Sequence, residues 1–316
     1  MEWKGKRILV TGGAGFLGSH LVDRLVERGS SVTVVDDFSF GKRENLNKQA
    51  RFIKLDIRNY EALKATISEA KPEMVFHLAA SATTKESAMG WLDPVFDYQV
   101  NAMGTLNVFR AIVSAGLKPH VIYASSAAVY GEPEYTPIDE KHPTNPLSPY
   151  GVSKLAGEKY AFAYFKEHGI PVTIMRIFNT YGPRQPRYVM FDLLGKLKHY
   201  PSKLEVIGTG EQLRNYCYVS DTTDAFILAA EKHAVGEVFN LAGKNAISIK
   251  ELVERILKML DLSGKTMVSY TGESWKGDIV KLVADTSRIK ERLGFEPKVP
   301  LNEGLSRFRE WFEESF

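Results

Sequence analysis

A tyrosine and a lysine that could carry out proton transfer stand four residues apart in the stretch YGVSK, as Tyr150 and Lys154. On a helix, positions i and i+4 share one face, so both side chains can point into one site. A nearby ammonium favours the phenolate, and it lowers the pKa of a tyrosine toward the range of a working general base. The pair alone is a common pattern, and it indicates redox chemistry only beside a dinucleotide site.

A glycine-rich stretch near the N-terminus, TGGAGFLG, predicts such a site. It follows an expected strand at residues 7–11 and opens an expected helix, which is the context that dinucleotide binding requires. Gly12 allows a tight turn, Gly15 lets the backbone approach a pyrophosphate, and Gly18 lets helix and strand pack closely. The free N–H groups of the helix N-terminus bind phosphate. The alternative is a glycine-rich turn that holds no ligand.

Acidic residues at the ends of the next strands favour NAD as the dinucleotide. Asp36 ends the second expected strand, about 20 residues after the glycines, where a carboxylate accepts hydrogen bonds from ribose hydroxyls and repels a 2′-phosphate. Asp37 could share this role, and Asp36 could instead be a strand-end turn residue. Asp56 follows the third expected strand and could receive the adenine amino group, or it could cap a turn or helix.

Polar side chains from two further segments are expected near the same edge of the sheet. Ser125 and Ser126 end a buried strand, where hydroxyls line the cleft at the carboxyl ends of parallel strands. Asn101 lies on the preceding helix, and its alternative is a polar helix residue satisfied locally. We expect no metal site, since the chain has one cysteine, Cys217, which also excludes an intrachain disulfide.

The elements that must position these residues alternate regularly in the first half of the chain. The apolar patterns predict strands at 7–11, 31–36, 51–55, 74–78, 120–125 and 172–176, with helices around 17–25, 63–67, 106–112 and 156–165. Such alternation predicts an α/β fold with a Rossmann-type, doubly wound parallel sheet. Beyond it we expect a loop at 179–187, a helix at 188–200, strands at 204–207, 215–219 and 238–241, a helix that Asp221 caps, and helices at 249–260 and 305–312.

This pattern divides the chain into two parts. Residues 1–178 form the expected NAD-binding domain, with 213–240 returning to it, and residues 179–212 and 241–316 form a smaller α/β lobe for the substrate. The composition, with 44% hydrophobic and 25% charged residues, is that of a soluble globular protein. A diffuse net charge of +3 argues against nucleic acid. No apolar stretch is long enough to span a membrane, and no signal-peptide core precedes the first strand, so we expect a cytoplasmic protein.

Five stretches, in this order, carry a family resemblance: TGGAGFLGSHL, HLAA, SSAAVYG, YGVSK and RIFNTYGPRQ. The chain resembles the extended short-chain dehydrogenases/reductases that act on nucleotide sugars, and within them the NAD-dependent epimerase/dehydratase family. The resemblance implies NAD as the cofactor, a nucleotide sugar as the substrate, and a homodimer that pairs through the helices around 106–112 and 156–165.

The resemblance also implies roles for individual residues. Tyr150 is then the base, Lys154 holds the nicotinamide ribose, and Ser126 hydrogen-bonds the reacting sugar hydroxyl. Asn179, Arg214 and Asp278 are expected to bind the substrate, the first two at the diphosphate. The residues expected around the dinucleotide, besides Gly12, Gly15, Gly18, Asn101, Ser125, Tyr150 and Lys154, are Phe16, Leu17, Asp36, Asp37, Ser39, Gly41, Asp56, Ile57, Leu78, Ala79, Ala80 and Phe178.

Two alanines narrow the reaction that this resemblance implies. Similar dehydratases carry an acid and a base directly after the serine of the catalytic strand, where this chain has Ala127 and Ala128. We therefore expect a 4-epimerase, with UDP-glucose and UDP-galactose as the expected pair. The alternatives are a 4-epimerase of uronic acids or N-acetylhexosamines, a 4-keto reductase, a 4,6-dehydratase or decarboxylase, or a non-catalytic dinucleotide sensor. Similar enzymes carry a diphosphate-binding Arg where this chain has Trp275 and, one residue on, Lys276.

Overall fold

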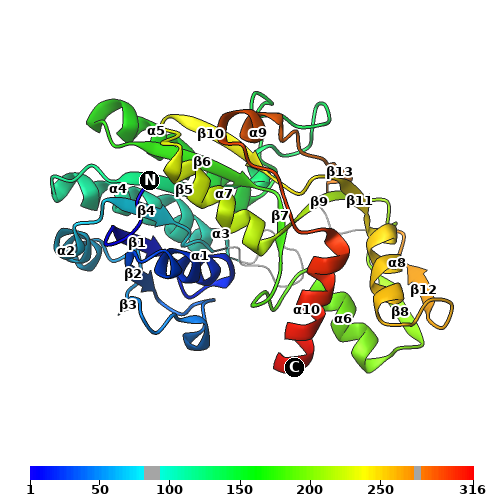
Figure 1. Ribbon diagram of the computed structural model, residues 1–316. Helices are drawn as coiled ribbons and strands as arrows, with labels where there is room; N and C mark the ends of the chain where they lie inside the picture. The colour runs from blue at the N-terminus through cyan, green and yellow to red at the C-terminus, as the bar shows by residue number, and fades with distance from the viewer. Residues whose placement is uncertain (82–92, 274–278) are drawn as a thin grey trace.

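The computed structural model describes residues 1–81, 93–273 and 279–316 (Figure 1). Its larger part is built on a seven-stranded parallel sheet in the order β10-β6-β5-β4-β1-β2-β3. The strand order reverses between β1 and β4, and the crevice at such a reversal is where open α/β sheets bind ligands. The strands are β1 (Arg7–Thr11), β2 (Ser31–Asp36), β3 (Arg51–Lys54), β4 (Met74–His77), β5 (His120–Ser126), β6 (Val172–Ile177) and β10 (Glu237–Leu241).

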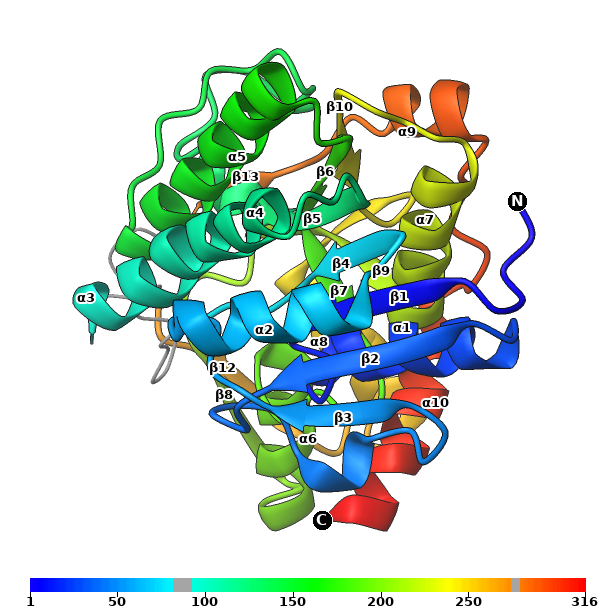
Figure 2. The ribbon, with the colours of Figure 1, turned by 90° about the vertical axis from the view of Figure 1, so that its left-hand side faces the viewer.

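Helices cover both faces of this sheet, which explains why its strands are continuously apolar. Side chains of β1 pack alternately into two hydrophobic clusters, with Ile8 and Val10 in one and Leu9 in the other. Figure 2 shows the helices of the two faces on either side of the sheet. One face carries α1 (Phe16–Glu27), α7 (Val219–Glu231) and α9 (Ser287–Leu293), and the other carries α2 (Tyr60–Ala70), α4 (Thr105–Ser114) and α5 (Pro149–His168). Two short helical segments, α3 (Pro94–Asp97) and the π-helix η2 (Tyr98–Gly104), lead into α4.

The smaller part has its own core, formed by two small sheets and three helices (Figure 1). The four-stranded sheet is mixed, because β9 pairs in parallel with β7 and β13 but antiparallel with β11. Its strands are β7 (Asn179–Tyr181), β9 (Leu213–Tyr218), β11 (Ala246–Ser248) and β13 (Lys281–Leu282); the two-stranded sheet joins β8 (Lys203–Val206) to β12 (Met267–Tyr270); and the helices are α6 (Val189–His199), α8 (Ile249–Met259) and α10 (Leu301–Ser315).

The doubly wound parallel sheet and the smaller α/β part agree with the sequence prediction, and two local expectations were wrong. The stretch 179–187 is not all loop, since it begins with β7, whose pairing partner β9 lies far away in the chain. Asp221 does not cap α7, which begins two residues earlier. Its carboxylate instead accepts hydrogen bonds from the backbone N–H groups of Lys298 and Val299, at 3.0 and 2.9 Å.

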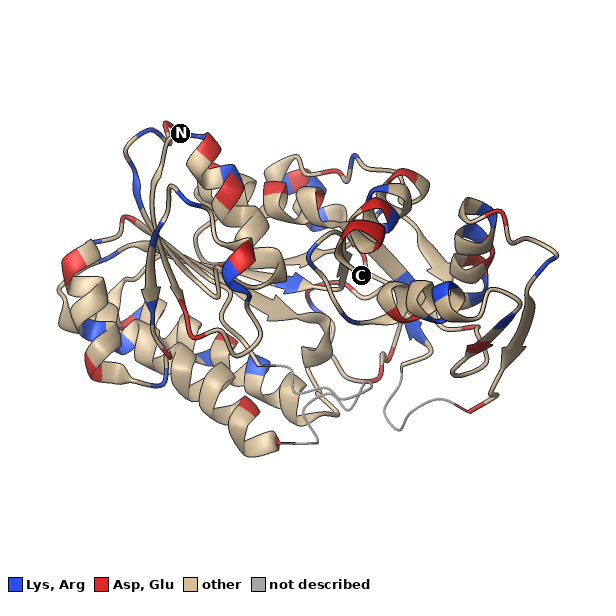
Figure 3. Ribbon diagram, turned by 90° about the horizontal axis from the view of Figure 1, so that it is seen from below, with Lys and Arg blue, Asp and Glu red and all other residues tan. Residues whose placement is uncertain are grey.

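Charges are dispersed over the surface rather than gathered by sign. In Figure 3, Lys and Arg alternate with Asp and Glu along both parts of the molecule. Within the three described ranges, no helix is both long and apolar enough to cross a bilayer. Within the segment 213–240, α7 packs on the large sheet and β10 is one of its strands, whereas β9 belongs to the smaller part.

Candidate active site

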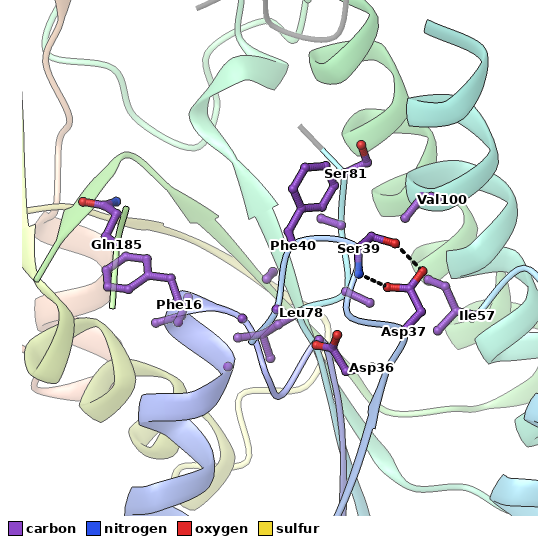
Figure 4. A pocket seen from close by; sticks show the side chains of 18 of the residues that line it. Phe16, Asp36, Asp37, Ser39, Phe40, Ile57, Leu78, Ser81, Val100 and Gln185 are labelled. Carbon is purple, nitrogen blue, oxygen red and sulfur yellow. Dashed lines mark hydrogen bonds between the residues drawn. The ribbon is translucent and has the colours of Figure 1, made fainter. Parts of the chain in front are cut away.

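A cavity of about 380 Å³ lies at the carboxyl ends of the central strands, between the large sheet and the segment that leads into α6. Nineteen residues that the sequence singled out line it together: Gly12, Gly15, Phe16, Leu17, Gly18, Asp36, Asp37, Ser39, Gly41, Asp56, Ile57, Leu78, Ala79, Ala80, Ser125, Ser126, Tyr150, Lys154 and Phe178. Figure 4 shows part of this wall, with Phe16, Asp36 and Leu78 around the same space. The cavity therefore joins the expected dinucleotide residues to the expected catalytic ones.

The glycine loop fits a pyrophosphate. A Cβ atom added to Gly18 would lie 2.0 Å from the Gly12 carbonyl oxygen, so the protein itself requires glycine there. Gly15 differs, because its φ of −77° is ordinary and an added Cβ would meet only the Gly12 carbonyl oxygen, at 3.3 Å. Nothing in the described protein demands a glycine at Gly15, yet it lines the cavity and is the N-cap of α1, which no side chain caps. Such a bare helix N-terminus suits a phosphate group.

Asp36 lies at the end of β2 with its carboxylate partly engaged. It accepts hydrogen bonds from the backbone N–H groups of Ala14, at 3.0 Å, and Phe38, at 2.8 Å. Burial raises the pKa of this carboxyl, and the two hydrogen bonds oppose that effect. Each carboxylate oxygen keeps a further acceptor site, so Asp36 can still receive ribose hydroxyls.

The other acidic residues of this end are bound to near neighbours. Asp37 accepts from the backbone N–H of Ser39 at 2.8 Å and from its hydroxyl at 2.5 Å (Figure 4). Asp56 forms an ion pair of 2.6 Å with Arg58, which also donates to it through Nε. Burial acts to raise the pKa of Asp56, but the hydrogen bonds from Arg58 lower it on balance. Both carboxylates are therefore held in place at the cavity wall.

Asn101 is the one expected dinucleotide residue that does not line the cavity. Its side-chain oxygen accepts from the Ser81 backbone N–H at 2.8 Å, and its amide donates to the Ser81 carbonyl oxygen at 2.7 Å and to the Ser153 hydroxyl at 3.0 Å. Asn101 thus lies behind the wall, where it fixes the segment that follows β4. Cofactor contact by Asn101 stays a prediction; in the structure its side-chain polar atoms are bonded to Ser81 and Ser153.

Two glycines bring α5, the helix that carries Tyr150 and Lys154, close to the end of β5. An added Cβ on Gly151 would lie 2.4 Å from the Ala128 carbonyl oxygen, and one on Gly157 would lie 2.2 Å from the Tyr123 hydroxyl oxygen. The helix begins at Pro149, after the Ser148 side chain accepts a hydrogen bond from the Gly151 N–H. This close packing places Tyr150 within hydrogen-bonding reach of Ser126.

The charge state of the Tyr150–Lys154 pair differs from the sequence expectation. Burial raises the pKa of Tyr150, and the hydrogen bond with Ser126 offsets this only in part. Burial also lowers the pKa of Lys154, to about 7, so its ammonium is itself disfavoured. The expected lowering of the Tyr150 pKa is therefore wrong for this structure. The phenol needs a further positive charge beside it to act as a base at neutral pH.

Directly after Ser126, the chain forms a buried 3-10 turn, η3 (Ala127–Val129). The Ser126 hydroxyl accepts a hydrogen bond from the Ala128 N–H at 3.2 Å and thereby caps this turn. Ala127 and Ala128 are 2% and 8% exposed. Neither side chain can transfer a proton, so no acid or base stands directly after Ser126 at the end of β5.

Asn179 and Arg214, the expected substrate residues of the smaller part that the structure describes, are not part of the cavity lining. Asn179 begins β7, next to Phe178 of the cavity wall, and its buried side-chain nitrogen has no hydrogen-bond partner among the described residues. Arg214 lies on the neighbouring strand β9, with Nη1 donating to the Leu213 carbonyl oxygen at 2.8 Å. Asp278, with Trp275 and Lys276, lies outside the described residues.

One wall of the cavity was missed by the sequence reasoning. It consists of Arg184, Gln185, Pro186 and Arg187, from the stretch predicted only as a loop, with Tyr188, the expected start of the next helix, and it faces Phe40. The Arg187 guanidinium lies 5.2 Å from the centre of the Phe40 ring and 5.1 Å from that of Tyr188. Arg184 forms an ion pair of 2.8 Å with Asp23 of α1. The Pro, Gly and Arg residues of this stretch predicted a loop. They did not indicate which surface the loop contacts.

In the described ranges, no three His, Cys, Asp or Glu side chains gather in a way that could hold a metal ion. Cys217 is buried, and burial raises the pKa of its thiol to about 12.

The fold and the cavity together define a Rossmann-type dinucleotide-binding protein. The sequence pattern of the NAD dependent epimerase/dehydratase family matches residues 8–242. A crystal structure of UDP-glucose 4-epimerase from Thermotoga maritima, with UDP-glucose, is similar with a TM-score of 0.90 and 36% identity over 98% of this chain and 99% of that chain. UDP-glucose 4-epimerase of Mycolicibacterium smegmatis is 35% identical over 97% of this chain and 98% of the relative. UDP-glucuronic acid decarboxylase 1 of Xenopus tropicalis is 33% identical over 98% of this chain and 72% of the relative.

The chain belongs to the NAD-dependent epimerase/dehydratase family and is an NAD-dependent enzyme that modifies a nucleotide sugar.

Proposed function

We propose that this enzyme is a 4-epimerase of a nucleotide sugar, with UDP-glucose and UDP-galactose as the substrate pair. The observation that carries this proposal is the buried pair Ala127–Ala128, which leaves the catalytic strand without an acid or base after Ser126. Among the described residues that line the cavity, the carboxylates are Asp36, Asp37 and Asp56, all at the ends of β2 and β3. Proton transfer at the sugar then falls to Tyr150.

In this proposal the Tyr150 phenolate takes the proton of the C4 hydroxyl, which Ser126 holds by a hydrogen bond. Lys154 binds the nicotinamide ribose and stabilises the phenolate. NAD, when bound, would supply a hydride acceptor for C4 and, in its reduced form, a hydride donor, so that none would be consumed in one turnover. The same tyrosine gives the proton back to the 4-keto oxygen when the sugar is reduced on its opposite face. Because the sugar must turn over between the two steps, the nucleotide is held tightly and the sugar loosely.

We also propose the division of labour between the two parts of the chain. Residues 1–178, with α7 and β10, hold the dinucleotide, and residues 179–212 and 241–316 hold the nucleotide sugar. Asn179 and Arg214 on the adjacent strands β7 and β9 are the proposed diphosphate contacts, with Asp278 beyond the described residues. A homodimer that pairs through α4 and α5, and a cytoplasmic location, remain predictions; light scattering of the purified protein tests the first.

A second candidate reaction is the decarboxylation of a nucleotide-linked uronic acid. Arg184 and Arg187 line the cavity, and the charge of Arg187 acts on Tyr150. A guanidinium beside the base suits the carboxylate of a uronic acid. A relative named as a UDP-glucuronic acid decarboxylase matches at nearly the same identity as the epimerase relatives.

The deciding experiment is incubation of the purified protein with UDP-glucose, UDP-galactose or UDP-glucuronic acid, without added NAD, and analysis of the products by NMR. We expect interconversion of the two UDP-hexoses with no net NADH. Release of carbon dioxide from UDP-glucuronic acid, without hexose interconversion, supports the second candidate. Absence of reaction with every UDP-hexose rules out the first.

A further inference from the structure

A third residue shares the inner face of α5 with Tyr150 and Lys154. Glu158 follows Lys154 by four residues, as Lys154 follows Tyr150, so all three lie along one side of the helix. Glu158 and Lys154 are each 1% exposed. The reaction proposed above does not use Glu158, although its carboxylate is deeply buried beside Lys154.

Both oxygens of the Glu158 carboxylate accept hydrogen bonds from residues of the large sheet. Its Oε1 accepts the Ser125 hydroxyl proton at 2.5 Å and the Arg176 Nε–H at 3.0 Å, and its Oε2 accepts from Arg176 Nη2 at 2.8 Å. Ser125 belongs to the cavity wall and precedes Ser126. Glu158 therefore connects the catalytic helix to the strand that carries the serine of the site.

Arg176 is anchored in turn on its far side. Its Nη1 donates to the Tyr130 hydroxyl oxygen at 3.0 Å, and its guanidinium lies 4.8 Å from the centre of the Tyr130 ring. The Tyr130 hydroxyl donates to Asn240 Oδ1 at 2.6 Å. A buried ion pair is weak evidence for stability, since burying two charges costs much of what their attraction returns. The ion pair lies directly behind the cavity wall, because Glu158 accepts the hydroxyl of Ser125, which lines the cavity, and this points to another role.

That role concerns the charge of Lys154. The ammonium lies 4.4 Å from the centre of the Tyr123 ring, in a buried site that favours the neutral amine. Glu158 is the group that opposes this, because its negative charge raises the pKa of Lys154. Among the described residues, the other titratable groups around Lys154 and Glu158 are Tyr150 on α5, Tyr123 on β5, His77 on β4, Arg176 on β6, Tyr130 after η3 and Glu140 beyond it.

We propose that Glu158 is a positioning residue of the reaction: its buried carboxylate keeps the Lys154 ammonium charged and fixes the end of β5 against α5. This rests on the proposed function only for the roles of Tyr150 and Lys154. Without Glu158, Lys154 is a neutral amine over more of the neutral pH range, and the Tyr150 phenolate loses its stabilising cation.

The test is the variant Glu158→Gln, studied with the bound cofactor over pH 6 to 9. If the pKa of Lys154 falls, the ammonium loses its proton at a lower pH. The alkaline limb of the pH profile of kcat then moves to lower pH. We expect kcat to fall about tenfold at pH 8, and much less at pH 6, for a fall of about one in the Lys154 pKa. KM for the nucleotide sugar changes little. A role in folding alone lowers kcat by one factor at every pH.

The second readout does not depend on activity. In protein labelled with 15N-lysine, the Nζ resonance of Lys154, assigned by its loss in Lys154→Arg, titrates at lower pH in Glu158→Gln than in the parent. Two controls are matched: Glu158→Asp keeps the charge and restores the alkaline limb, and Glu140→Gln, in a half-buried carboxylate that accepts the Asn240 N–H, leaves both readouts unchanged. The NMR titration tests the proposal even where no UDP-hexose reacts.

The variant Glu158→Gln leaves Arg176 without its partner and can fail to fold. The double variant Glu158→Gln, Arg176→Gln leaves neither charge buried alone and then carries the test, because it removes the carboxylate that raises the pKa of Lys154. An unchanged Lys154 titration, or a loss of kcat that is equal at pH 6 and pH 8 in whichever of the two variants folds, overturns the proposal.

Discussion

Gly151 of α5 lies directly against the Ala128 carbonyl oxygen, which an added Cβ would meet at 2.4 Å. The contact sets how closely Tyr150, the preceding residue, approaches Ser126. A methyl group at Gly151 pushes the start of α5 away from η3, because the opposing atom is backbone and cannot rotate aside.

We therefore expect Gly151→Ala to lower kcat by about tenfold or more, as a displacement of about 1 Å at a catalytic group costs up to ~100-fold. The measurement is steady-state kinetics with bound NAD. Gly195→Ala on α6 is the matched control, since an added Cβ there meets nothing within 4 Å and alanine favours a helix. Full activity in Gly151→Ala means that the contact does not position the base.

Tyr150→Phe removes the proposed base without changing the shape of the cavity wall. We expect kcat to fall by about 100-fold to 10,000-fold, the usual contribution of a positioned proton-transfer group. The NAD content of the purified protein, measured after denaturation, stays that of the parent. Tyr135→Phe removes an exposed hydroxyl that donates to Asp139 and serves as the control. Turnover that survives in Tyr150→Phe assigns the base to another residue.

The glycine loop predicts opposite outcomes at two positions. Gly15→Ser provides a good N-cap at a residue with suitable backbone angles, so the unfolding free energy of the cofactor-free protein is kept or rises by about a few tenths of a kcal/mol. The side chain enters the space proposed for the pyrophosphate, and NAD binding weakens at least about tenfold.

Gly18→Ala instead forces a Cβ to within 2.0 Å of the Gly12 carbonyl oxygen. It destabilises the cofactor-free protein by about 1–3 kcal/mol. Urea unfolding and NAD titration of both variants separate the two effects. Unweakened NAD binding in Gly15→Ser places the pyrophosphate elsewhere.

Buried histidines predict how stability depends on pH. Burial lowers the pKa of His20 to about 4, of His77 to about 3 and of His120 to about 4. Between about pH 4 and the unfolded value of 6.5, the unfolded chain binds more protons than the folded one, so stability falls as pH falls. The slope is on the order of 1.4 kcal/mol per pH unit for each histidine.

Urea unfolding at pH 7, 6 and 5 measures this slope. His20→Gln lowers it by one histidine's share, because the buried His20 no longer adds to the difference in bound protons. A slope that is the same in His20→Gln and the parent means that His20 is accessible to protons in the folded state.

Long apolar runs made the large sheet predictable. The bounds of β1 and β2 coincide with the expected strands, because every residue after the first of each is buried by helices on both faces. The strands of the smaller part were harder. β7, β11 and β13 have two or three residues each, and their existence depends on pairing with β9 rather than on a local pattern.

The same distinction holds for the site. Residue type and strand position placed Asp36 and Ser126 at the same edge of the sheet, and both line the cavity. The sequence could not show that Asn101 is hydrogen-bonded to Ser81, or that the Ser125 hydroxyl donates a hydrogen bond to Glu158. Both interactions depend on contacts between distant segments. It also could not give the balance of burial against charge that decides the pKa of Tyr150.

The wall that faces Phe40 has a consequence for cooperativity. His20 of α1 donates to the Pro183 carbonyl oxygen at 2.9 Å, and Asp23 one turn later pairs with Arg184, so α1 holds the segment that leads into the smaller part. A ligand in the cavity then contacts residues from both parts of the chain at once. Its binding free energy is added to the unfolding free energy of each. The loaded protein should therefore melt as one unit, and the two parts should separate into distinct transitions only as the ligand is removed.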